Sequence, residues 1–266
     1  MHKAALITGS SEGLGKAFAF ELAGRGVDLV LVSLPGSGLP GLAAFIIKNY
    51  SIQVSYFEMD LTQTDNCVQL FNSLKEKRML IHILINNAGI GNWSWFEEER
   101  LEFYKKQIEL NVLTPVLLTK LFLEQVNKTE KKYLLNVGSL GGLFIIPKKQ
   151  VYGATKSFIR YFTKCLRMEL SHTNVSVSLL SPGGISTKPE LLVLNHELKG
   201  ISRYSILEPD SMAKIAIEDM LNGKKEIIPG LTNKLMVYIS TVLPNYIIEC
   251  IMQKQTKKIS TNSFFK

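Results

Sequence analysis

Short apolar runs alternate with longer segments of helical periodicity along most of the chain. The runs, rich in Val, Ile and Leu, are Ala4–Thr8, Leu29–Ser33, Val54–Phe57, Ile81–Ile85, Tyr133–Val137, Val175–Leu180 and Glu226–Ile228. Most of them lack alternating polar residues, which is typical of parallel strands buried on both faces. The helical segments lie near Leu14–Arg25, Gly41–Tyr50, Asp65–Lys77, Glu98–Asn127, Val151–His172 and Asp210–Leu221. This alternation predicts an α/β fold, a doubly wound parallel sheet of about seven strands with helices on both faces.

One domain and a carboxyl-terminal extension account for the whole sequence. No internal repeat or linker divides the chain, so we expect a single domain over residues 1–230 and a helical extension over residues 231–266. In the extension, Leu235–Met252 is apolar but interrupted by polar residues and a proline, and is too broken to span a membrane. We expect this lysine-flanked segment to lie at a membrane interface, to cover a site on the domain or to pack on a neighbouring subunit.

Composition and charge argue against several other classes of protein. The three cysteines are widely spaced and the histidines are not clustered, so we expect no disulfide framework, no metal and a cytoplasmic location. A position peripheral to a membrane follows if the extension contacts lipid. The net charge of +8 comes from dispersed residues, and no nucleic-acid-binding motif accompanies it, so we expect no nucleic-acid partner.

A glycine-rich loop follows the first predicted strand, in the segment Thr8–Gly15. Glycines allow a tight turn and let the backbone approach a pyrophosphate closely. The helix that follows would direct its amino-terminal N–H groups at the same anion. The loop therefore predicts a dinucleotide site, because ligands of open parallel sheets bind beyond the carboxyl ends of the strands.

Tyr152 and Lys156 form a Y-xxx-K pair on a predicted helix. Positions i and i+4 share one helix face, so the phenol and the ammonium can address the same space. An unperturbed tyrosine, with a pKa of about 10, is a poor base at neutral pH, and a nearby cation lowers that pKa. The pair therefore predicts an acid/base centre.

These motifs together resemble those of the short-chain dehydrogenase/reductase family. The glycines follow G-xxx-G-x-G, Asn86–Gly89 reads N-N-A-G after the fourth predicted strand, and Pro182-Gly183 closes the sixth. The resemblance extends up to about Gly230. It implies a Rossmann fold with a catalytic domain over residues 1–230. It also implies an NAD(P)-dependent oxidoreductase that transfers hydride between the nicotinamide and a carbonyl or alcohol.

The resemblance further implies a set of cofactor contacts. Carried over by motif, they are Gly9, Ser11, Gly13, Leu14, Gly15, Ser33, Asp60, Leu61, Asn87, Ala88, Gly89, Tyr152, Lys156, Pro182, Gly183, Ile185 and Thr187. In the family, Asp60 and Leu61 correspond to adenine contacts, and Ile185 and Thr187 to contacts at the nicotinamide end. Lys156 corresponds to a residue that also binds the nicotinamide ribose.

Ser139 and Asn111 complete the implied catalytic set of Asn111, Ser139, Tyr152 and Lys156. Ser139 follows the fifth predicted strand, where the family's serine bonds the substrate oxygen; many members carry a second serine where this chain has Gly138. Asn111 lies four residues before Pro115, which lacks the N–H that would bond the Asn111 carbonyl in a helix. In the family this asparagine holds a water of a proton relay.

The residues near the predicted ribose site favour NADP(H) over NAD(H) by a modest margin. An acidic residue ends the second strand in relatives that prefer NAD, and this chain has Ser33 there. The absence of a carboxylate admits a 2′-phosphate, yet Leu34 supplies no cation and Glu12 would repel the phosphate.

Apolar loops are expected to form the walls of the substrate site. They are Gly91–Phe96, Leu143–Ile146 and Leu191–Leu194, which suit a lipophilic ketone, a hydroxysteroid-like compound or a 3-oxoacyl-type substrate. The same side chains would also suit a lid or a subunit contact. We expect a homodimer or homotetramer paired through the helices near Glu98–Asn127 and Val151–His172. A non-catalytic dinucleotide-binding regulator on the same fold is the competing interpretation.

Overall fold

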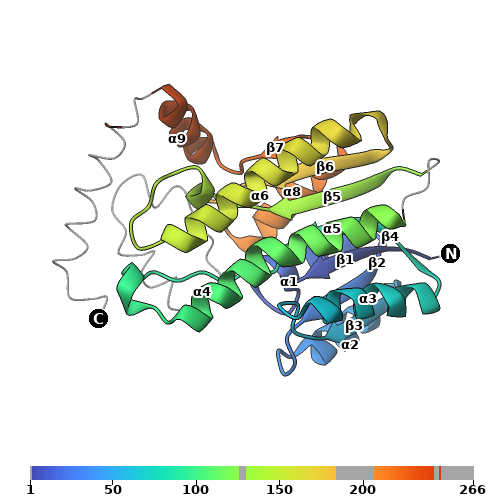
Figure 1. Ribbon diagram of the computed structural model, residues 1–266. Coiled ribbons are helices and arrows are strands. Elements are labelled where there is room, and N and C mark those ends of the chain that lie inside the picture. The colour runs from blue at the N-terminus through green and yellow to red at the C-terminus, as the bar shows by residue number, and fades with distance from the viewer. Residues whose placement is uncertain (1, 126–129, 184–206, 243–245, 247–266) are drawn as a thin grey trace.

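The computed structural model describes residues 2–125, 130–183, 207–242 and 246, and a parallel sheet runs through their centre (Figure 1). The strands are β1 (His2–Thr8), β2 (Asp28–Ser33), β3 (Val54–Glu58), β4 (Met79–Asn86), β5 (Lys132–Val137), β6 (Val175–Leu180) and β7 (Glu226–Ile227). Their order is β3-β2-β1-β4-β5-β6-β7, and each neighbouring pair is parallel. The predicted doubly wound sheet is confirmed, and each predicted run overlaps its observed strand.

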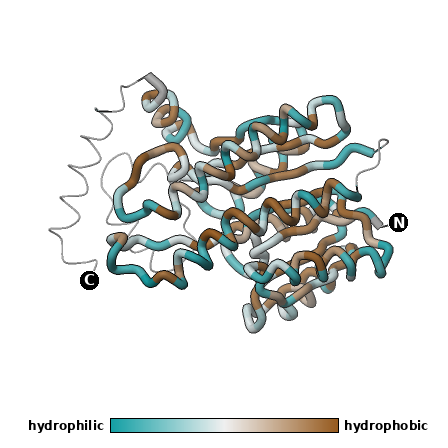
Figure 2. The backbone as a smooth tube through the Cα atoms, viewed as in Figure 1, coloured by the Kyte–Doolittle hydropathy of each residue, from teal (hydrophilic) through white to brown (hydrophobic). Residues whose placement is uncertain are grey.

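Helices cover both faces of this sheet. On one face lie α1 (Gly13–Gly24), α2 (Leu39–Asn49) and α8 (Pro209–Leu221); on the other lie α3 (Thr64–Glu76), α5 (Thr114–Glu124) and α6 (Gln150–Glu169). Successive strand residues point to opposite faces, so Ile7 joins the first core and Leu6 the second. Because both faces are buried, both kinds of position are apolar, which explains the unbroken apolar runs. Figure 2 shows apolar positions recurring along α3 and α5 between hydrophilic ones.

The predicted helix Glu98–Asn127 is divided in the structure. The 3-10 turn η1 (Phe96–Glu98) is followed by α4 (Leu101–Ile108), the π turn η2 (Glu109–Leu113) and then α5. The single-helix prediction is therefore wrong at its start, because Arg100 has extended backbone angles, and the helix begins only at Leu101. The π turn ends two residues before Pro115, and the Thr114 N–H donates to the carbonyl of Glu109, five residues back.

The other predicted helices shift by one or two residues at their starts. Pro40 stands in the first turn of α2 and Pro209 in that of α8, which begin two residues and one residue earlier than predicted. Helix α6 ends at Glu169 and the chain continues in the 3-10 turn η4 (Leu170–His172). These differences move no residue of the predicted site off its element.

Helix α9 (Leu231–Val242) lies outside the two helical layers (Figure 1). The Asn233 side chain donates to the Pro229 carbonyl at 2.7 Å, which ties the first turn of the helix to the residues just before it. Leu231, Leu235 and Tyr238 are exposed. Within the described residues, no helix is both long enough and apolar enough to cross a membrane. The remainder of the predicted extension, apart from Tyr246, lies outside the described residues.

Candidate active site

A groove of about 500 Å³ opens at the carboxyl ends of β1 to β4, where the strand order reverses between β1 and β4. It is lined by every cofactor contact predicted from these strands: Gly9, Ser11, Gly13, Leu14, Gly15, Ser33, Asp60, Leu61, Asn87, Ala88 and Gly89. Residues from four separate loops thus meet in one place. The groove has the position and size that a dinucleotide requires in this class of sheet.

The glycine loop has a backbone that other residues would not tolerate. Gly9 and Gly13 have positive φ angles of 63° and 53°. A Cβ atom on Gly15 would lie 1.9 Å from the Gly9 carbonyl oxygen, so the loop and α1 pack backbone to backbone. Helix α1 begins at Gly13 inside the groove, with no side-chain cap and no acidic residue in its first turn. These features fit a bound pyrophosphate.

Thr8 and Asn87 hold the glycine loop against the loop after β4. The Thr8 hydroxyl accepts the backbone N–H groups of Asn87 and Ala88, both at 3.0 Å. In return, the Asn87 amide donates to the carbonyls of Thr8 and Gly9 at 2.9 and 3.2 Å. The predicted cofactor contact Asn87 therefore also shapes the groove.

Two groove residues, Ser37 and Lys106, escaped the sequence analysis. The Ser37 hydroxyl is buried and has no hydrogen-bond partner among the described residues. The Lys106 ammonium lies 3.7 Å from the Asp60 carboxylate. Burial alone would raise the pKa of Asp60, but hydrogen bonds from Thr62 and the Lys106 charge bring it below its ordinary value. Lys106 and Leu110 both line the groove. Their i, i+4 spacing places them on one helix face and was the sequence signal that could have predicted Lys106 as a groove residue.

Tyr152 is held among backbone and side-chain groups from three elements. A Cβ atom on Gly91 would lie 2.7 Å from the Tyr152 ring, so the backbone after β4 packs directly on the phenol. A Cβ atom on Gly141 would lie 3.3 Å from Ser139 Oγ and 3.4 Å from Tyr152 Cε1, which places serine and tyrosine side by side. Burial raises the pKa of Tyr152, and a hydrogen bond with Ser139 opposes this in part. The predicted lowering of the phenol's pKa by Lys156 is therefore wrong: the pKa is raised by burial, and only the Ser139 hydrogen bond opposes the rise.

Lys156 is buried behind the tyrosine. Its ammonium donates to the Val137 carbonyl at 2.9 Å and lies 5.8 Å from the centre of the Tyr152 ring. Burial lowers the pKa of Lys156 to about 8. A Cβ atom on Gly89 would lie 3.4 Å from this ammonium, so Gly89 joins the groove to the Y-xxx-K pair.

Asn111 clamps the loop after β4 through its side chain. The amide donates to the Ile90 carbonyl at 2.9 Å and to Thr155 at 3.1 Å, and its oxygen accepts the Ile90 N–H at 2.9 Å. Thr155 donates in turn to the Tyr152 carbonyl at 2.7 Å. Thr155 was not predicted, because its position inside the Y-xxx-K motif carries no chemistry of its own. The loop, the π turn and α6 are thereby joined at one point.

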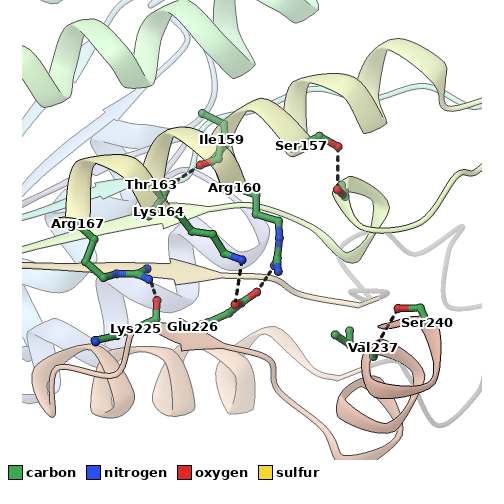
Figure 3. Close-up of polar contacts among 11 residues, drawn as sticks. Ser157, Ile159, Arg160, Thr163, Lys164, Arg167, Lys225, Glu226, Val237 and Ser240 are labelled. Atoms are coloured by element: carbon green, nitrogen blue, oxygen red, sulfur yellow. Dashed lines mark hydrogen bonds and ion pairs between the residues drawn. The ribbon is translucent and has the colours of Figure 1, made fainter. Parts of the chain in front are cut away.

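Polar contacts join α6 to β7 and to the loop after β5 (Figure 3). Arg160 and Lys164 both pair with Glu226 of β7, and Arg167 donates to the Lys225 carbonyl. Ser157 donates to the Gly142 carbonyl at 2.7 Å, which holds the 3-10 turn η3 (Leu140–Gly142) against the helix. The helix that carries Tyr152 and Lys156 is thus anchored to the sheet and to the loop that carries Ser139.

The remaining predicted contacts are only partly described. The Pro182 carbonyl accepts the Leu140 N–H at 2.9 Å, so the turn after β6 lies beside the serine loop, with Gly183 next to it. Ile185, Thr187 and the predicted wall Leu191–Leu194 lie outside the described residues.

Comparisons with known proteins agree with this geometry. The family model for short chain dehydrogenase matches residues 3–191. A very-long-chain 3-oxoacyl-CoA reductase of Macaca fascicularis is 28% identical, over 97% of this chain and 83% of that protein. A solved 7β-hydroxysteroid dehydrogenase has a TM-score of 0.83 at 24% identity, covering 95% of this chain and 96% of its own. A short-chain dehydrogenase from Sphingobium yanoikuyae in complex with NADPH has a TM-score of 0.77 at 24% identity, covering 100% and 98%.

Three observations support the same family assignment. They are the groove, the Y-xxx-K pair with its neighbouring serine, and the family match over most of the chain. The chain belongs to the short-chain dehydrogenase/reductase family, and it is an NAD(P)-dependent oxidoreductase that acts on alcohol and carbonyl groups.

Proposed function

We propose that Tyr152 exchanges the proton with the substrate oxygen and that Ser139 holds that oxygen in place. The observation that carries this proposal is the placement of Ser139 beside a half-buried Tyr152, whose ring packs against Gly91 and Gly141. A bound nicotinamide would supply or accept the hydride. The protein's task is then to orient the carbonyl, exclude water and move one proton.

Lys156 and Asn111 support this step from behind. We assign Lys156 to the nicotinamide ribose and to stabilising the Tyr152 phenolate, because its buried ammonium lies near both the groove and the ring. Asn111 holds the loop that packs on Tyr152 and is assigned to the proton relay. A non-catalytic regulator would need the groove but none of these four side chains. The proposal is tested by incubating the protein with a panel of ketones and either NADPH or NADH. Hydride transfer is measured as the loss of absorbance of the reduced nicotinamide.

For the substrate, we propose a lipophilic ketone or alcohol, with 3-oxoacyl-type and hydroxysteroid-like compounds as the leading classes. The loops beside Tyr152 expose apolar side chains, including Trp93, Phe96 and Ile145. The similarity to a reductase named for 3-oxoacyl-CoA supports the first class.

For the cofactor, we propose a modest preference for NADP(H). Ser33 stands where a carboxylate would repel the 2′-phosphate, and its hydroxyl accepts the Ser11 N–H at 3.0 Å. The Ser37 hydroxyl lines the same groove and offers a phosphate a further donor, whereas the positive charge of Lys106 is offset by its ion pair with Asp60. The full set of cofactor contacts, including Ile185 and Thr187, remains part of this proposal.

Exchanging residues at the end of β2 should shift the cofactor preference in both directions. Ser33→Asp should favour NAD(H) by roughly tenfold, because a carboxylate accepts the ribose diol and repels the phosphate. Leu34→Arg should favour NADP(H) by a similar factor, since Leu34 is exposed and an arginine there has room to reach the phosphate. The measurement is the ratio of kcat/KM for the two cofactors. A wild type that strongly prefers NAD(H) and is unmoved by Ser33→Asp would place the ribose site elsewhere.

We also propose that the protein is a homodimer or homotetramer. An open apolar groove of about 430 Å³ runs between α4 and α6, lined by Ile108, Val112, Gln150, Val151, Ala154, Thr155 and Phe158. Further along α6, Tyr161 and Met168 are exposed. These apolar side chains are not needed to pack the helices on the sheet. They form an apolar stripe that is available for contact with a second copy of the chain.

Light scattering should therefore give a mass of at least twice that of one chain at micromolar concentration. Phe158→Glu, at the centre of the stripe, should shift the mass toward one chain, because it would bury an unpaired charge. Phe45→Glu, at an exposed position on α2, is the matched control and should leave the mass unchanged. A wild type of single-chain mass would contradict the proposal.

For the extension, residues 231–266, we propose contact with a membrane surface or with another subunit, and for the chain a cytoplasmic location. The apolar side chains of Leu231, Leu235, Tyr238 and Ile239 are exposed along α9. The free thiols of Cys67 and Cys165 suit a reducing compartment.

A further inference from the structure

In the sequence, two consecutive lysines, Lys148 and Lys149, stand between Ser139 and Tyr152. The Lys149 ammonium stands between two aromatic rings, 5.1 Å from the centre of Trp93 and 5.0 Å from that of Tyr152. The Lys148 ammonium lies 4.5 Å from the Trp95 ring. All three contacts are within cation–π range. The lysines are therefore part of the substrate wall.

The turn that carries these lysines is held firmly. Lys148 is 8% exposed and has a positive φ angle of 67°, which is strained for a residue other than glycine. Its carbonyl accepts the Ser94 N–H at 3.2 Å, so the lysine turn and the tryptophan loop are joined by their backbones. This packing holds the two ammonium groups in place, whereas the side chain of a lysine on an open surface moves freely.

Neither ammonium group has an anionic partner in the part of the chain that the structure describes. The nearby glutamates are engaged elsewhere: Glu98 accepts the Trp95 N–H, and Glu99 accepts from the Asn92 amide. Lys149 also precedes the first turn of α6, where the helix dipole disfavours a cation, and no acidic residue occupies that turn. Burial lowers the pKa of Lys149. A partly buried cation at this position costs stability unless an anion joins it.

We propose that Lys149, supported by Lys148, binds an anionic group of the carbonyl substrate and so selects substrates that carry a carboxylate or a phosphate. This inference rests on the proposed function in one respect: the anionic group is taken to be part of the same substrate whose oxygen Tyr152 protonates. The two tryptophan rings would pack on the apolar part of such a substrate, and the helix amino terminus would add to the attraction for the anion.

Matched pairs of substrates separate the two sources of negative charge. The first arm compares keto carboxylates of increasing length with their neutral amides. The second compares acetoacetyl-CoA with acetoacetyl-N-acetylcysteamine, which has the same thioester without the phosphates. For at least one arm, the wild type should have a higher kcat/KM for the charged member. Lys149→Met should lower the charged-to-neutral ratio by roughly tenfold, mainly through KM, and Lys149→Arg should retain most of it.

This design distinguishes anion binding from an effect on the tyrosine alone. If Lys149 only tuned Tyr152, Lys149→Met would lower kcat/KM equally for both members of each pair, and the ratio would not move. Lys48→Met, at an exposed position on α2, is the control and should leave every value unchanged. An unchanged ratio for Lys149→Met in both arms would overturn the inference.

Tryptophan emission gives a readout that needs no turnover. The chain has two tryptophans, and both lie against these lysines. Titration with the charged probes should change the emission saturably in wild type and Lys149→Arg, but not in Lys149→Met. Emission changes without hydride transfer would overturn the proposed function while the anion site stands. Turnover without any such change or charge preference would overturn the anion site while the function stands.

Discussion

Tyr152→Phe should lower kcat by about a thousandfold or more while dinucleotide binding changes little. The substitution removes only the phenolic oxygen, and general acid/base groups typically contribute about 10²–10⁴ in rate. The ring that packs on Gly91 and Gly141 remains, so the loops around it should keep their positions. The measurements are steady-state turnover with a reducible ketone and the change in NADPH fluorescence on binding.

The control for this variant is Tyr161→Phe. Tyr161 lies on the same helix, and its side chain is 75% exposed. The substitution removes only a hydroxyl and keeps the apolar ring of the proposed stripe, so it should leave kcat within about twofold. Turnover of Tyr152→Phe close to the wild-type value would remove the tyrosine from the mechanism, whereas loss of dinucleotide binding would show that the variant disturbs the groove.

Lys156→Met should impair both catalysis and dinucleotide affinity. The ammonium is assigned to the phenolate and to the ribose, so we expect kcat to fall by about a hundredfold and the dissociation constant of the dinucleotide to rise roughly tenfold. Single-turnover kinetics and fluorescence titration measure the two effects separately. Unchanged affinity would remove the ribose contact from the assignment.

The same variant should be more stable than the wild type near neutral pH. Burial lowers the pKa of Lys156 from 10.5 to about 8, so below pH 8 the folded protein keeps a proton that burial disfavours. Between the two pKa values the unfolded chain binds more protons, and wild-type stability rises with pH there. The Tm advantage of Lys156→Met should therefore be largest below pH 8 and shrink as the pH rises toward 10.5. This pattern would show that lost activity is not lost folding.

The sequence predicted those features that depend on local pattern. Unbroken apolar runs indicated strands buried on both faces, and Ile7 and Leu6 do pack into opposite cores. The glycine loop and the residues after β2, β3 and β4 converge on one groove, because parallel strands end at the same edge of a sheet.

The features that escaped depend on which segments the fold brings together. Ser37, Lys106 and Lys149 have ordinary sequence surroundings, and only the packing of distant loops gives them their neighbours. The interrupted helix escaped for a different reason. Pro115 signalled an irregular turn, but the extended Arg100 backbone that delays the start of α4 has no comparable signal.

Transfer of deuterium from the nicotinamide to the product tests the central claim most directly. The enzyme is incubated with NADPH or NADH deuterated at C4 and with a panel of apolar and anionic ketones, and the alcohols are analysed by mass spectrometry. We predict that deuterium appears on the carbinol carbon with the wild type and is lost with Tyr152→Phe. A wild type that binds the dinucleotide but labels no alcohol, or a Tyr152→Phe variant that labels it at the wild-type rate, would contradict the account.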